Sequence, residues 1–178
     1  MNISRISVRY AKAFFETALE DKKADIIYKD VRVFLEAVEI ADFKLILENP
    51  SISPSNKMQI FKDVFKNKVD ELSIQFLNLL TKNKREQYLK HISLNFLQLY
   101  RKFNGIKHVD ITTAFPIDDN LRKEIENIIS IKFKTKVELS ENVDNSIIGG
   151  FIVKVEDNLY DASVTGKLKE VKIELLHA

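Results

Sequence analysis

The stretch that decides the fold of this chain is Val137–Lys167, which reads VELSENVDNSIIGGFIVKVEDNLYDASVTGK. Residues 150–155 alternate apolar with other side chains, and residues 159–162 resume the alternation after a polar turn at residues 156–158. This is the pattern of two paired strands. The pair Gly149-Gly150 stands at the start of the first strand. Because glycine has no Cβ, the pair suits a bulge or a close approach by another backbone segment.

The sequence on either side of this hairpin predicts a small domain of strand, helix, strands and helix. A strand is expected at His108–Phe115, where the residue type alternates. A helix should follow from Asp118, and a closing helix should run from about Val164 to His177. Strands and helices that are not strictly interleaved favour the α+β class.

The helical half of the chain should end at Asn104-Gly105, where a glycine follows the last helical residues. We therefore place a domain boundary at residues 104–107. The predicted fold is a six-helix bundle at residues 1–104, followed by a small α/β domain at residues 108–178. The class of the whole chain is predicted to be α+β.

The first helix, expected from about Ser4 to Glu20, has an apolar side wider than a simple bundle needs. Its charged residues share one narrow arc, and apolar or small residues fill the remaining ~240° when residues are placed at 100° steps. A surface helix needs an apolar stripe only slightly wider than about 100°. The fifth helix, about Asp70 to Lys82, has the same feature. The excess must be covered by neighbours in the bundle or by a partner chain, and the pattern leaves both open.

Ordinary start and stop signals delimit the other helices of the first half. These helices are expected at about 24–41, at about 42–48, from Ser53 onward and at about 86–103. Ser53 can cap a helix whose first residue is Pro54, a position at which proline is well tolerated. Pro50 disfavours the helical conformation in the residue before it and so ends the preceding helix.

Composition excludes several classes of function. The 178 residues carry 28 Lys and Arg against 26 Asp and Glu, giving a net charge of +2 with no basic stripe. Nucleic acid is therefore not an expected partner. The absence of cysteine excludes disulfides, thiolate catalysis and zinc–thiolate sites. No apolar run approaches eighteen residues, so any membrane association should pass through another chain.

Residues that invite a catalytic interpretation lack the partners that such chemistry needs. Thr165-Gly166-Lys167 is no phosphate loop, because Asp161 stands where the first loop glycine would be. The three histidines, His91, His108 and His177, have no companions at metal-ligand spacing. We expect a binding protein with no cofactor, no metal, no small-molecule substrate and no catalytic residues. A nucleic-acid-binding adaptor and a small-molecule enzyme are the rival classes, marked by a basic stripe and by a polar pocket respectively.

Several motifs, taken in order along the chain, resemble those of one family. These are Arg9-Tyr10-Ala11-Lys12-Ala13-Phe14, Asn49-Pro50-Ser-Ile52-Ser53, Val137-x-Leu139, Val143-Asp144, Ile147-x-Gly149-Gly150-Phe151-x-Val153-Lys154-x-Glu156 and Asp161-Ala-Ser163-x-x-Gly166-Lys167-Leu168. They resemble the F-type ATP synthase delta subunit, whose family includes the mitochondrial oligomycin sensitivity-conferring protein. Two positions depart from the family pattern: Phe14 replaces leucine, and Lys84 stands where glycine is usual.

The resemblance implies a non-catalytic stator subunit of a rotary ATP synthase. Such a subunit ties the peripheral stalk to the catalytic head, so that rotor torque is resisted during ATP synthesis coupled to ion transport. The implied partners are an alpha subunit, bound by the first domain, and the b subunits, bound by the second. The implied location is peripheral, at the cytoplasmic face of the bacterial plasma (inner) membrane. The resemblance also marks a set of signature residues with a structural role: Val143, Asp144, Gly149, Gly150, Asp161 and Ser163.

The resemblance places the alpha-subunit site between the first and fifth helices, the two with wide apolar arcs. The borders of those arcs then supply the predicted contact residues, which are Ile6, Tyr10, Ala13, Thr17, Leu72, Gln75 and Leu79. The small residues Ala13 and Thr17 would let a helix come close, and Tyr10 would be an aromatic anchor. The opposite edge of the first helix, formed by Val8, Phe15 and Leu19, is the alternative.

Overall fold

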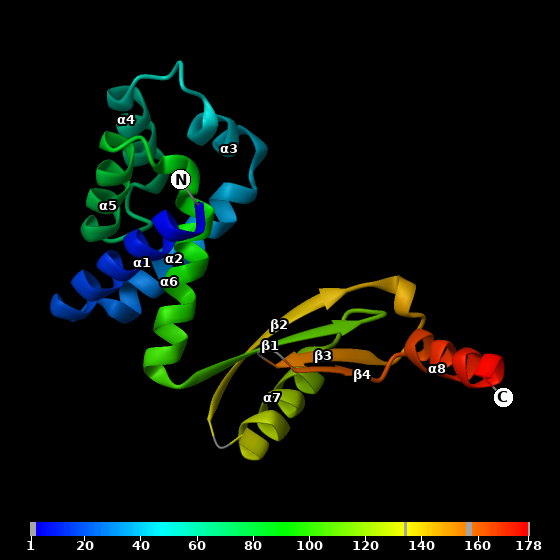
Figure 1. Ribbon diagram of the computed structural model, residues 1–178. Helices are drawn as coiled ribbons and strands as arrows, with labels where there is room; N and C mark the ends of the chain where they lie inside the picture. The colour runs from blue at the N-terminus through cyan, green and yellow to red at the C-terminus, as the bar shows by residue number, and fades with distance from the viewer. Residues whose placement is uncertain (1–2, 134, 156–157, 178) are drawn as a thin grey trace. The chain divides into compact units, whose positions relative to one another are not determined.

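A computed structural model describes residues 3–133, 135–155 and 158–177. The described residues combine eight α-helices with one four-stranded sheet (Figure 1). The predicted mixture of helices and sheet is therefore confirmed. The chain divides into two compact units, residues 1–100 and 101–178, and each is described by itself. The boundary at residues 104–107 stays a prediction about independent folding.

The first unit is helical and follows the predicted order of elements. Its helices are α1 (Ile3–Glu20), α2 (Ala24–Glu39), α3 (Ala41–Glu48), α4 (Pro54–Phe65), α5 (Glu71–Lys82), η1 (Glu86–Tyr88) and α6 (Leu89–Asn104). As predicted, Ser53 caps α4, its side-chain oxygen accepting a hydrogen bond from the Asn56 amide at 3.2 Å. The predicted sixth helix is interrupted, because its first turn is the 3₁₀ helix η1.

Aromatic side chains of α1 occupy the middle of the first unit. The ring of Phe14 stacks on Phe76 of α5 with centroids 3.9 Å apart, and it also lies 5.2 Å from Phe96 of α6. Phe15 meets the same Phe96 ring edge-on at 5.5 Å. The apolar side of α1 is wide because α5 and α6 both pack against it. Burial of such rings removes a large apolar area from water and so stabilises this unit.

One buried ion pair joins α4 to η1. The Lys57 ammonium donates to Glu86 Oε1 at 2.7 Å and to the Leu47 carbonyl oxygen at 3.0 Å. Both charged side chains are buried. Since a buried charge is costly unless it is paired, Glu86 and its 3₁₀ turn are held in place by a residue 29 positions away.

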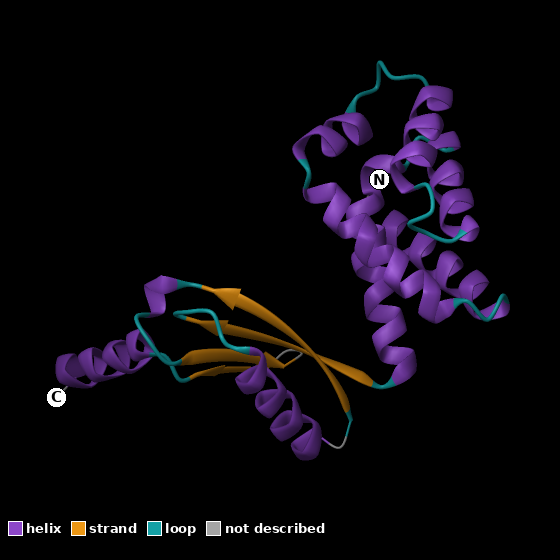
Figure 2. Ribbon diagram, turned by 180° about the vertical axis from the view of Figure 1, so that it is seen from behind, coloured by secondary structure: helices purple, strands orange, loops and turns teal. Residues whose placement is uncertain are grey.

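The second unit is a mixed sheet with one helix packed on it (Figure 2). Its elements are β1 (Ile106–Thr113), α7 (Asp119–Phe133), β2 (Lys136–Val143), η2 (Asn145–Ile147), β3 (Phe151–Val155), β4 (Asn158–Asp161) and α8 (Val164–His177). The strand order is β2-β1-β3-β4; β1 runs parallel to β2 and antiparallel to β3, and β3 runs antiparallel to β4. The hairpin predicted from residues 150–162 is thus β3–β4. Residues 156–157 of its predicted turn lie outside the described residues.

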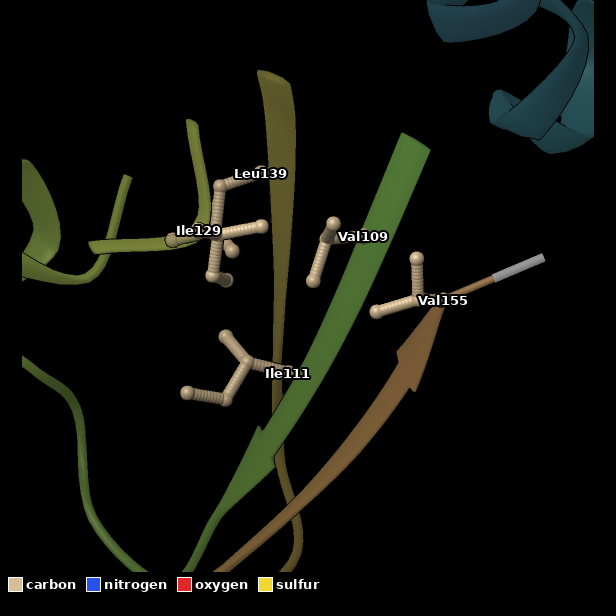
Figure 3. Packing of buried hydrophobic residues seen from close by; sticks show 5 residues of the cluster. All are labelled: Val109, Ile111, Ile129, Leu139 and Val155. Carbon is tan, nitrogen blue, oxygen red and sulfur yellow. The ribbon is translucent and has the colours of Figure 1, made fainter. Parts of the chain in front are cut away.

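The core of the second unit lies between α7 and the sheet. Figure 3 shows its members, Val109, Ile111, Ile129, Leu139 and Val155, which come from α7 and from three of the strands. Alternation along the strands places these residues on one face. By contrast, Val164, Leu168 and Leu175 of α8, three apolar residues whose spacing places them on one side of the helix, are all exposed.

Candidate partner-binding surfaces

The first candidate surface is a groove of about 480 Å³ between α1 and α5. Side chains of only these two helices line it: Arg9, Tyr10, Ala13, Phe14, Thr17, Leu72, Gln75, Phe76 and Leu79. The stacked rings of Phe14 and Phe76 are buried and form its floor. Ala13 and Thr17 make one wall low, because their side chains are small. The groove is therefore shallow, apolar and open to an elongated partner.

The structure brings six of the seven predicted contact residues together in this groove. These are Tyr10, Ala13, Thr17, Leu72, Gln75 and Leu79. The seventh, Ile6, is 5% exposed and belongs to the hydrophobic core, so it does not line the groove. The alternative edge of α1 includes Phe15, which is also buried, against Phe96. Helical spacing gives the direction of each side chain, but only the neighbouring helices decide which directions stay open.

A polar network anchors the start of α5 and thereby fixes one wall of the groove. The buried Asp30 carboxylate of α2 accepts hydrogen bonds from the Ser73 hydroxyl at 2.6 Å and the Asp70 amide at 2.8 Å. Asp70 caps α5 by accepting from the Leu72 amide at 2.9 Å. Its carboxylate also accepts from Lys23 at 2.9 Å. Local sequence did not reveal this network, because the bonds that tie α5 to Lys23 and Asp30 join residues 40 or more positions apart along the chain.

Asp70 and Lys23 shift each other's pKa. The hydrogen bond from Lys23, with help from the Leu72 amide, holds the pKa of Asp70 below its ordinary value. The same bond raises the pKa of Lys23. Both groups are therefore fully charged near neutral pH, and the α5 cap is intact there.

The signature glycines and acids meet where β4 leads into α8. The Val164 amide donates to the Gly149 carbonyl oxygen at 3.0 Å. A Cβ on Gly150 would lie 2.3 Å from the Ala162 carbonyl oxygen, and the φ of Gly150 is +76°. Only glycine fits such a site. The close approach of another backbone, one of the two alternatives predicted for the glycine pair, is therefore observed.

Asp161 and Ser163 form two successive caps at the start of α8. Asp161 Oδ1 accepts from the Ser163 amide at 2.8 Å, and the Ser163 hydroxyl oxygen accepts from the Gly166 amide at 2.9 Å. The hydrogen bonds from Ser163 lower the pKa of Asp161. Asp144 similarly accepts from the Ser146 amide at 2.9 Å, and hydrogen bonds from the Ser146 side chain and amide lower the pKa of Asp144. The remaining signature residue, Val143, is exposed at the end of β2. All these acids serve backbone amides, as carboxylates at turns commonly do.

A second apolar cavity, of about 750 Å³, lies between α7 and the sheet. It is lined by Ile111, Thr113, Ala114, Phe115, Ile117, Leu121, Ile125, Ile128, Ile129, Gly149, Gly150, Phe151, Val153, Val155 and Tyr160. Phe115 and Ile128 at its rim are 70% and 65% exposed. Sequence analysis predicted the helix from Asp118 but not this opening beneath it. The sequence signal that could have indicated this cavity is the large number of bulky apolar residues in the short second unit.

Across the described ranges, no three His, Cys, Asp or Glu side chains gather as a metal site would require. In the same ranges, no helix has the length and apolar character needed to cross a membrane.

Two separate apolar surfaces, one on each unit, define a binding protein of mixed α and β structure. Residues 6–175 match the model of the ATP synthase delta (OSCP) subunit family, and the chain belongs to that family. It is thus a peripheral-stalk component of an ATP synthase, a structural stator subunit and not a catalytic one.

Bacterial relatives support this assignment along the whole chain. A protein described as ATP synthase subunit delta in Cytophaga hutchinsonii is 36% identical over 97% of this chain and 94% of its own length. The subunit of the same description in Clostridium botulinum is 32% identical over 94% of each chain. A chain in the Toxoplasma gondii mitochondrial ATP synthase hexamer is 24% identical, covers 96% of this chain and 97% of its own, and superposes with a TM-score of 0.75. This last likeness shows that the fold is shared.

Proposed function

We propose that this chain links the peripheral stalk to the catalytic head of a rotary ATP synthase. Its first six α-helices form a bundle that binds the N-terminal helix of an alpha subunit, and its second domain binds the C-terminal ends of the b subunits. In this role it resists rotor torque at the cytoplasmic face of the bacterial plasma membrane. The observation that carries the proposal is the groove in which six residues, chosen from sequence, come together.

The shape and chemistry of the groove suit an amphipathic helix. A helix laid in a groove buries a row of apolar side chains, here against Phe14 and Phe76, and gains affinity from that burial. A few exposed ion pairs would contribute little and would weaken with salt. A contact that must withstand torque is better served by the apolar groove.

The second domain offers the complementary surface for the stalk. The cavity beneath α7 is almost wholly apolar, and Phe115 and Ile128 at its rim are exposed. Apolar patches of this kind on a folded domain commonly mark interaction sites. A stalk helix seated here would cover side chains that the chain itself leaves open to water.

Substitution of Ala13 by arginine tests the alpha-subunit site. Ala13 is exposed in the free chain, so Ala13→Arg should leave the thermal melt unchanged. Binding of a synthetic peptide from the N-terminus of the alpha subunit should weaken by at least about tenfold, since the arginine fills the groove and its charge would be buried without a partner. Ala41→Arg, the same change at an exposed site of α3, is the matched control. Undiminished binding to Ala13→Arg would remove the site from this groove.

Substitution of Ile128 by glutamate tests the stalk site. Ile128→Glu should weaken binding of a peptide from the C-terminal end of a b subunit by about tenfold or more, because it places a charge at the rim of the cavity. The control is Ile131→Glu on the same helix, where Ile131 is exposed but does not line the cavity. Equal binding by the two variants would place the stalk contact elsewhere on the domain.

A further inference from the structure

Arg9 is the only charged side chain among the described residues that line the α1–α5 groove. The other eight lining residues are apolar or neutral. From the sequence, Arg9 belongs to the polar arc of α1 and would be assigned to the solvent. The structure leaves Arg9 exposed, as that assignment requires, but places it at the edge of the groove, beside Tyr10.

The contacts of Arg9 leave its charge unneutralised. Its Cζ lies 5.7 Å from the centroid of the Tyr10 ring, so the guanidinium lies over an aromatic side chain that itself lines the groove. Among the described residues no carboxylate forms an ion pair with Arg9, whereas Lys12 on the same helix lies 3.7 Å from Glu16. Arg9 is thus held near the site with its donors available.

A bound helix changes the surroundings of this charge. As an apolar segment fills the groove, it displaces water from the Tyr10 side of Arg9 and lowers the local dielectric. A cation that loses hydration without gaining a partner opposes binding. A carboxylate on the incoming helix would remove that penalty, and the planar guanidinium can hold a carboxylate by two hydrogen bonds.

We infer that Arg9 is a specificity-determining residue that pairs with an Asp or Glu carboxylate of the incoming alpha-subunit helix. This inference rests on the proposed function of the groove. Thr17, at the other end of the groove, is eight residues from Arg9, or about 12 Å along the helix axis. The carboxylate must therefore lie at the end of the bound segment beside Arg9, and the pair fixes the direction in which the partner helix lies.

The first arm of the test varies this chain. Full-length wild type, Arg9→Gln, Arg9→Lys and Lys12→Gln are titrated with the synthetic alpha-subunit N-terminal peptide at low and high salt. Arg9→Gln should bind about fivefold more weakly at low salt and lose most of its salt dependence, as expected for one partly exposed ion pair. Arg9→Lys should be intermediate because it keeps the charge and loses the planar donors. Lys12→Gln, which removes the same charge outside the groove, should bind like wild type.

The second arm varies the peptide, replacing each Asp or Glu in turn by its amide. One replacement should weaken binding to wild type and leave binding to Arg9→Gln unchanged, which is the coupling expected of a direct pair. If no replacement shows coupling, or if Arg9→Gln binds as well as wild type, the inference about Arg9 is overturned alone. If wild type itself fails to bind the peptide, the proposed function of the groove is overturned and the inference falls with it.

Discussion

Lys84 ends α5 in a backbone conformation that favours glycine. Its φ is 55°, its amide donates to the Thr81 carbonyl oxygen at 3.0 Å, and the Arg85 amide donates to the Leu80 carbonyl oxygen at 2.8 Å. These two bonds form a Schellman cap, whose left-handed residue is usually glycine. The departure from the family glycine therefore leaves the turn in place but makes it strained.

Lys84→Gly should stabilise the chain. Removing the Cβ relieves about 1–2 kcal/mol of steric cost in the left-handed region, and the greater freedom of glycine in the unfolded chain offsets part of it. The expected gain in free energy of unfolding is about 0.5–1 kcal/mol, measured by urea denaturation. Lys82→Gly, inside the last turn of α5, is the control and should lower stability by up to about 1 kcal/mol. A loss of stability in Lys84→Gly would contradict this account.

Acid should weaken the cap of α5 through Asp70. The pKa of Asp70 is lowered in the folded chain, chiefly by Lys23. A carboxyl with a lowered folded pKa binds protons more readily when unfolded, so its stabilisation is complete above about pH 4 and is lost as the pH falls through the folded pKa. Thermal melts between pH 6 and pH 3 should show a shallower fall for Asp70→Asn than for wild type. Glu36→Gln, at an exposed position of α2, should retain the wild-type slope.

At the scale of elements, local signals predicted helix ends well and long-range packing poorly. The cap at Ser53 lies within three positions of the amide that it serves, so sequence alone located the start of α4. The periodicity placed the start of α5 at about Asp70, but the cap that Asp70 gives the Leu72 amide was not predicted. The 3₁₀ turn at Glu86 depends on the distant Lys57 and was missed. The cavity under α7 was also missed, because the spacing of apolar residues along a helix does not tell how closely that helix packs on the sheet. Likewise, helical spacing gave the direction of the Ile6 side chain around the axis of α1, but it did not reveal that the core buries this side chain.

The junction between the β3–β4 hairpin and α8 should tolerate no side chain at Gly150. Gly150→Ala would combine a left-handed backbone with a Cβ placed 2.3 Å from the Ala162 carbonyl oxygen. Gly105→Ala is a matched control in the same unit, because Gly105 has a φ of +62° but nothing within 4 Å of its Cβ position. We expect Gly105→Ala to cost about 1 kcal/mol and Gly150→Ala about 2–3 kcal/mol more, from the added overlap. Equal losses in the two variants would mean that the close approach is relieved at little cost.

At the scale of the whole molecule, each unit carries its own apolar surface and its own core. The groove is built entirely from α1 and α5, and the second cavity entirely from residues between Ile111 and Tyr160. Neither surface requires residues of the other unit. A chain organised in this way can bind two partners at once, which is what a link between stalk and head must do.

Separate cores predict that the first domain folds alone. A fragment ending at Asn104 keeps all of α6 and every residue of the groove. It should give a helical circular dichroism spectrum and a cooperative melt, and it should bind the alpha-subunit peptide with an affinity within about twofold of the full chain. The fragment from residue 108 should be less stable, because about 70 residues is near the lower limit for a self-sufficient core. If the N-terminal fragment is unfolded, the domain boundary predicted at residues 104–107 is wrong. A folded fragment with weakened peptide binding would mean that the second domain contributes to the alpha-subunit site.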